Sequence, residues 1–283
     1  MNAPTLLNRF LRWAGEEPCV RLAILIGSRV SEGLADDLSD YDISLFGKLD
    51  SLSRSDAWLD TIAPQWICIH EQVLWDQVSV PTRLVIFRGG TKMDFALHSL
   101  SLLEAMISKG ELKPAYLAGY RILLDKDGWS AQLPLAPGAA YELSFPNEQQ
   151  FREAIDEFWF EAYHVAKYLH RSDWWVAQVR EGAMKKWMLR MLQWSAMASK
   201  GKPIHPGPDG KRLLSWIRED DYRRLKNCSL GWEARLAGPA LQNCLSLFRD
   251  ASSKTGGSLG FPLEEHRIDE MEEFIRRLME NVG

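Results

Sequence analysis

Apolar residues recur with different periods in the two halves of the chain. In the first half, short apolar runs are bounded by turn residues, which predicts strands at 20–26, 43–46, 83–87, 92–97 and 120–125. In the second half, apolar residues return every three or four positions, which predicts long helices at 151–169 and 175–199 and shorter ones at 212–217, 239–250 and 264–281. We therefore expect an α+β fold, in which a domain with a small mixed β-sheet precedes a helical bundle.

Turn and breaker residues divide the chain further. A helix is expected at 6–14, with Thr5 as its N-cap and Gly15 at its end, and another at 53–62. The paired Gly89 and Gly90 predict a hairpin between the strands at 83–87 and 92–97. Proline and alanine gather in 129–146, and prolines and glycines in 200–210, which predicts irregular chain there. The expected organisation is a domain at 1–133, a linker at 134–146 and a helical domain at 147–283.

The most informative segment lies between the first two predicted strands. Gly27-Ser28 follows the first strand. Asp40-Tyr41-Asp42 follows after eleven intervening residues, where the second strand begins. Side chains at i and i+2 of a strand share a face, so Asp40 and Asp42 should project together. Two crowded carboxylates repel unless a cation lies between them, and Mg²⁺ takes such oxygen ligands together with nucleotide phosphates. Gly27 would let the backbone approach a triphosphate, and Ser28 would offer a hydroxyl and an N–H as donors.

A third carboxylate, Asp94, lies on the second arm of the predicted hairpin. If the sheet is mixed, Asp94 lies close to the strand that carries Asp40 and Asp42. A carboxylate between Met93 and Phe95 is costly to bury alone, and a metal ion or a substrate hydroxyl would relieve that cost.

The Gly-Ser turn, the Asp-x-Asp strand and the later Asp94 resemble the signature of the DNA polymerase β-like nucleotidyltransferase superfamily. Segments farther along resemble one branch of it, the aminoglycoside 6-adenylyltransferases, also called streptomycin adenylyltransferases. These segments are 123–127, 156–159, 165–169 and 188–194. The resemblance spans most of the chain.

The resemblance implies Mg²⁺-dependent transfer of AMP from ATP to an aminoglycoside hydroxyl, with release of pyrophosphate. Asp40 and Asp42 would hold the metal, and Asp94 would complete the metal site, act as the general base, or do both. Gly27 and Ser28 would cradle the phosphates of the nucleotide. Arg29 belongs to the same motif, which supports a phosphate contact for it. Lys211 follows a glycine loop, from which it could reach the triphosphate.

Acidic side chains along the first long helix suggest how a cationic acceptor would be held. They are Glu153, Asp156, Glu157 and Glu161. Such a band is commonly a solvated face, but it would also attract an aminoglycoside. Trp159 lies beside the main apolar stripe, so we expect it either to pack in the core or to line a sugar site.

Composition narrows the function classes. A net charge of −4 disfavours a nucleic-acid partner and suits a small cationic substrate. The four cysteines form no C-x-x-C pair, and neither a signal peptide nor a membrane span is recognisable, so we expect a cytoplasmic enzyme. Two alternatives stay open, a nucleotidyltransferase with another small-molecule or protein acceptor and a non-catalytic nucleotide-binding module. The oligomeric state is left open.

Overall fold

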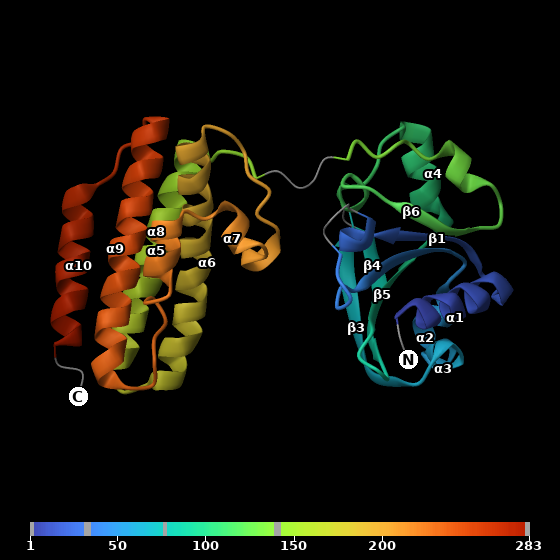
Figure 1. Ribbon diagram of the computed structural model, residues 1–283, viewed down its shortest axis with the longest axis horizontal. Coiled ribbons are helices and arrows are strands. Elements are labelled where there is room, and N and C mark those ends of the chain that lie inside the picture. Colours follow the sequence, from blue (N-terminus) through green and yellow to red (C-terminus); the bar gives the residue numbers. More distant parts are fainter. Residues whose placement is uncertain (1–2, 31–34, 76–77, 139–142, 281–283) are drawn as a thin grey trace. The chain divides into compact units, whose positions relative to one another are not determined.

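A computed structural model describes residues 3–30, 35–75, 78–138 and 143–280 (Figure 1). The chain divides into two compact units, residues 1–140 and 141–283, and the division falls inside the segment expected to be the linker. The units are described one at a time.

The N-terminal unit is built on a six-stranded sheet with the strand order β3-β4-β5-β2-β1-β6. β2 and β5 run parallel, whereas every other neighbouring pair is antiparallel, so the sheet is mixed as predicted. The strands are β1 (Val20–Ile26), β2 (Tyr41–Gly47), β3 (Gln65–Trp75), β4 (Val78–Phe87), β5 (Lys92–His98) and β6 (Arg121–Asp125).

Helices cover the two faces of this sheet unequally (Figure 1). On one face, α1 (Ala3–Glu16), α2 (Asp50–Arg54) and α3 (Ala57–Ile62) bury a core that includes Phe10, Leu59 and Phe95. On the other face, α4 (Leu100–Lys109) packs over the part of the sheet that carries Ile24 and Phe46. The remaining part of this second face carries the candidate site.

Several local expectations were wrong. The first helix begins at Ala3 and ends at Glu16, so Thr5 lies inside its first turn and Gly15 does not end it. The helix expected at 53–62 is two short helices, because the chain turns at Ser55-Asp56. Neither β3 nor α4 was predicted, and β4 begins five residues before the expected strand at 83–87.

The C-terminal unit is helical, as predicted, and α5, α6 and α9 surround its core. The ring of Phe158 on α5 stacks on Phe248 of α9, with the ring centroids 3.6 Å apart. Asn147 and Gln150 form a capping box at the start of α5, which fixes where this helix begins. The helices are α5 (Glu148–His170), α6 (Trp174–Lys200), α7 (Leu213–Trp216), α8 (Glu219–Leu225), α9 (Ala234–Leu259) and α10 (Glu265–Met279).

α9 extends beyond the expected 239–250 at both ends. Pro239 lies inside α9, in its second turn, where it lacks the N–H of one intrahelical hydrogen bond. Among the described helices, none has the length and apolar character required to cross a membrane.

Candidate active site

The sheet register brings two of the predicted carboxylates side by side. Asp42 on β2 pairs with Asp94 on β5, and side chains of paired residues point to the same face. Asp40 immediately precedes β2. Asp42 and Asp94 both line a cleft of about 190 Å³ on the second face of the sheet, together with Ser44, Glu71 and Thr82.

Lys92 links the carboxylates of Asp40 and Asp94. Its Nζ donates hydrogen bonds to Asp40 Oδ2 at 2.8 Å and to Asp94 Oδ2 at 2.7 Å. Burial alone would lower the pKa of Lys92, but these hydrogen bonds outweigh burial and raise it, so the ammonium stays charged. Lys92 was not predicted as a site residue, although its position two residues before Asp94 on one strand predicts a shared face.

Asp94 is more enclosed than Asp40 or Lys92. Its side chain is 18% exposed, and its Oδ1 is buried without a hydrogen-bond partner in the described part of the chain. Burial raises the pKa of Asp94, Lys92 opposes that shift, and the charges of Asp40 and Glu71 reinforce it. A buried carboxylate oxygen with no donor is costly, and a bound cation or a substrate hydroxyl would satisfy it.

Gly27 is required by the position of Asp42. It begins a short 3₁₀ turn, Gly27–Val30, directly after β1 and has a φ of +78°. A Cβ on Gly27 would lie 2.2 Å from Asp42 Oδ2, so the carboxylate occupies the space that any other residue would fill. Ser28 is half-buried in the same turn.

Arg29 holds the backbone that leads into the carboxylate strand. Its Nε donates to Ser39 O at 3.0 Å and to Asp40 O at 3.1 Å, and its guanidinium carbon lies 4.0 Å from the centre of the Tyr41 ring. These contacts position Asp40 and Asp42. The contact of Arg29 with a nucleotide stays a prediction.

Glu71 is a second residue that the sequence analysis overlooked. It lies on β3 and pairs with Thr82, which in turn pairs with Ala96, so its carboxylate faces the same side as Asp94. Because β3 was not predicted, no sequence signal connected Glu71 with Asp94.

The acidic side chains of α5 separate into two kinds. Glu161 is buried and accepts hydrogen bonds from Arg180, and Asp156 is paired with Arg267 at 2.7 Å. Glu153 and Glu157 are exposed, and no described residue forms an ion pair with either. The expected band is therefore partly a set of structural ion pairs.

The remaining predicted residues also belong to the helical unit. Trp159 is 2% exposed and packs edge-on against Phe158, so a core role accounts for it, and its contact with a substrate stays a prediction. Lys211 is exposed, next to the tight turn at Gly207. Its contact with a nucleotide stays a prediction.

The fold and this site define a class of protein. A mixed sheet with a glycine turn after one strand, an Asp-x-Asp at the start of the next and a third aspartate in register on a parallel neighbour is the arrangement of a nucleotidyltransferase. The carboxylates supply hard oxygen ligands beside a backbone that a phosphate can approach.

Comparison with known sequences identifies the family. The sequence model of the streptomycin adenylyltransferase family matches residues 2–278, and the chain belongs to that family. An aminoglycoside 6-adenylyltransferase from Campylobacter jejuni is 26% identical over 266 residues, covering 91% of this chain and 90% of the relative. Another from Staphylococcus aureus is 25% identical over 288 residues, covering 98% of each chain.

A solved structure of an aminoglycoside 6-adenyltransferase from Bacillus subtilis is similar at 20% identity and a TM-score of 0.44, covering 100% of this chain and 99% of that one. At that score the likeness is loose. The family assignment rests on the sequence matches.

Proposed function

We propose that this enzyme transfers AMP from ATP to a hydroxyl of a streptomycin-like aminoglycoside and releases pyrophosphate, with Mg²⁺ as the metal. The observation that carries the proposal is the in-register pair of Asp42 and Asp94, with a buried Asp94 oxygen that no described residue satisfies. A module that only binds a nucleotide has no need of a third, buried carboxylate beside the first two.

The donor set fits a magnesium ion. Asp40, Asp42 and Asp94 offer carboxylate oxygens only, which are the ligands that Mg²⁺ takes. When bound there, Mg²⁺ would supply charge neutralisation for the phosphates of ATP. Gly27 and Ser28 would approach those phosphates from the neighbouring turn.

In the proposed reaction, Asp94 accepts the proton of the attacking hydroxyl. The hydroxyl oxygen forms a bond to the α-phosphorus as the bond from that phosphorus to the pyrophosphate oxygen breaks. The raised pKa of Asp94 makes it a stronger base than an ordinary surface carboxylate. A stronger base accepts the proton of the hydroxyl more readily. The Lys92 ammonium would stabilise negative charge that develops on the attacking oxygen.

Mass spectrometry tests the proposed reaction. Purified enzyme is incubated with ATP, Mg²⁺ and a panel of acceptors that contains streptomycin, other aminoglycosides and neutral polyols. We expect the mass of AMP to be added to streptomycin and not to the polyols, and Asp42→Asn to abolish the product. Transfer to neutral acceptors in preference to every aminoglycoside would favour another acceptor class, and no transfer to any acceptor would favour a binding module.

The exposed carboxylates on α5 supply a physical reason for a cationic acceptor. Neutralising Glu153 and Glu157 together should raise the KM for streptomycin more than the KM for ATP, by about 0.2–1 kcal/mol for each charge, or up to roughly fivefold each. Asp156→Asn is the matched control, because Arg267 already compensates Asp156. Equal effects on both substrates would remove α5 from the acceptor site and leave the transfer reaction standing.

A further inference from the structure

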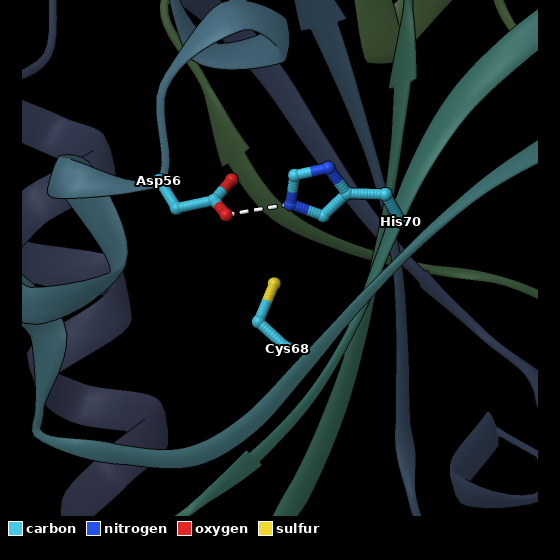
Figure 2. Close-up of side chains that lie close together, drawn as sticks. All are labelled: Asp56, Cys68 and His70. Carbon is cyan, nitrogen blue, oxygen red and sulfur yellow. Dashed lines mark hydrogen bonds and ion pairs between the residues drawn. The ribbon is translucent and has the colours of Figure 1, made fainter.

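A separate group of metal-binding side chain types lies on the first face of the sheet (Figure 2). Cys68 and His70 are two positions apart on β3 and share a face, and Asp56 lies in the short link between α2 and α3. One ligand atom from each residue lies within 4.8 Å of the other two. Since Glu71 faces Asp94, its neighbour His70 points to the opposite face, away from the catalytic carboxylates.

A buried arginine holds the carboxylate of Asp56 in place. Arg83 is 3% exposed, and its Nε donates to Asp56 Oδ1 at 2.8 Å while its Nη2 donates to the carbonyl of Ser53. The other oxygen, Asp56 Oδ2, lies 2.6 Å from His70 Nε2. Metal-binding carboxylates are commonly oriented by such a contact to their second oxygen.

Zinc would have to displace a proton from this group. Burial raises the pKa of Cys68 to about 11, so the thiol keeps its proton when no metal is bound. The His70 side chain is 57% exposed, which leaves it able to turn and leaves the cluster open to solvent on one side.

We propose that Asp56, Cys68 and His70 form a binding site for one zinc ion, with water in the fourth position. One sulfur, one nitrogen and one oxygen donor match the preference of Zn²⁺ and exclude Mg²⁺, which takes oxygen ligands. On binding, the Cys68 sulfur would exchange its proton for a bond to zinc, and that proton would pass to solvent. His70 would bind through a neutral ring nitrogen.

The geometry requires only a small rearrangement. Bonds of roughly 2.0–2.3 Å in a tetrahedral site separate neighbouring ligand atoms by about 3.3–3.6 Å. The distance of 2.6 Å between His70 Nε2 and Asp56 Oδ2 would therefore increase. The Cys68 sulfur, which lies within 4.8 Å of a ligand atom of each of the other two residues, would move closer to them. Rotation of the exposed His70 ring would supply the first movement. The ion would clamp the edge strand β3 to the link between α2 and α3.

Cobalt is the spectroscopic probe, because Co²⁺ bound to a thiolate produces a charge-transfer band that carboxylate-bound Co²⁺ lacks. Metal-free full-length protein is titrated with Co²⁺ and then with Zn²⁺. We expect the band to saturate at one equivalent and to disappear when Zn²⁺ displaces the cobalt. Cys68→Ser should lose the band, and His70→Asn should weaken Co²⁺ binding about tenfold or more.

Matched variants separate this site from the other thiols and from the catalytic carboxylates. Cys19→Ser removes another half-buried cysteine of the N-terminal unit and should keep the band. Asp42→Asn removes a catalytic carboxylate and should keep it as well, so failure of the proposed reaction would leave this result unaffected. Cys68→Ser should retain AMP transfer and a normal circular dichroism spectrum.

Three results would overturn the zinc site. They are the absence of the band in the wild-type protein, its persistence in Cys68→Ser, and unchanged Co²⁺ affinity in His70→Asn. In each case the three side chains would form only the ion pairs and hydrogen bonds already described around Asp56.

Discussion

Gly27→Ala perturbs the site through a single methyl group. The new Cβ would lie 2.2 Å from Asp42 Oδ2, whereas real Cβ contacts essentially never fall below 3.0 Å, so the carboxylate must retreat by about 0.8 Å. A misplacement of about 1 Å can cost roughly 10²-fold in rate, and we expect a loss of that order in turnover. The positive φ adds a separate cost of about 1–2 kcal/mol in the free energy of unfolding.

Gly90→Ala is the matched control for Gly27→Ala. Gly90 also has a positive φ, +87°, but a Cβ there would meet nothing within 4 Å. Turnover is measured as pyrophosphate release or as AMP added to the acceptor, and stability is measured by urea unfolding. Both variants should lose similar stability, and only Gly27→Ala should lose most of its turnover. Near-normal turnover in Gly27→Ala, or equal losses in both variants, would refute the contact between Gly27 and Asp42 as the reason for the glycine.

Three further predictions follow from the site and its surroundings. Asp40→Asn and Asp42→Asn should each lose most turnover with an unchanged circular dichroism spectrum, and near-normal activity in either would remove that residue from the metal site. Lys92→Met should shift the acid limb of the kcat/KM profile to higher pH, because Lys92 lowers the pKa of Asp94, whereas Lys92→Arg should keep the limb in place. Asp125 accepts backbone N–H bonds from Gly128 at 2.9 Å and Ser130 at 2.8 Å, so Asp125→Ala should lower the free energy of unfolding by about 1–3 kcal/mol in urea titrations at neutral pH. Burial alone would raise the pKa of Asp125, but hydrogen bonds from the Ser130 side chain and from backbone N–H groups that include Ser130 lower it. The wild-type advantage should therefore persist above about pH 4 and vanish as pH falls through the depressed folded-state pKa, and an advantage independent of pH would contradict this account.

Sequence periodicity predicted the features that depend on local geometry. The i and i+2 spacing of Asp40 and Asp42, and the apolar runs that became β1, β5 and β6, needed no knowledge of distant partners. β3 was not predicted because it is an edge strand that exposes Trp66 and other apolar side chains, so apolar and polar residues do not alternate cleanly along it.

Features that depend on packing between distant segments could not be read from spacing. The link from Lys92 to Asp40 depends on β5 lying parallel to β2, and the pairing of Glu161 with Arg180 depends on how α5 packs on α6. Trp159 is buried because α5 contacts several helices, which widens its apolar face beyond the stripe that a simple period predicts.

Lys92 also bears on the order in which substrates arrive. Its ammonium lies between Asp40 and Asp94, so a free divalent cation entering between them would have to compete with a charge that the protein itself supplies. A cation that arrives already bound to a triphosphate brings negative oxygens to which the displaced ammonium can turn. The lysine would thus act as an internal competitor that favours the metal–nucleotide complex over the bare ion, and in its absence the carboxylates would hold metal without nucleotide.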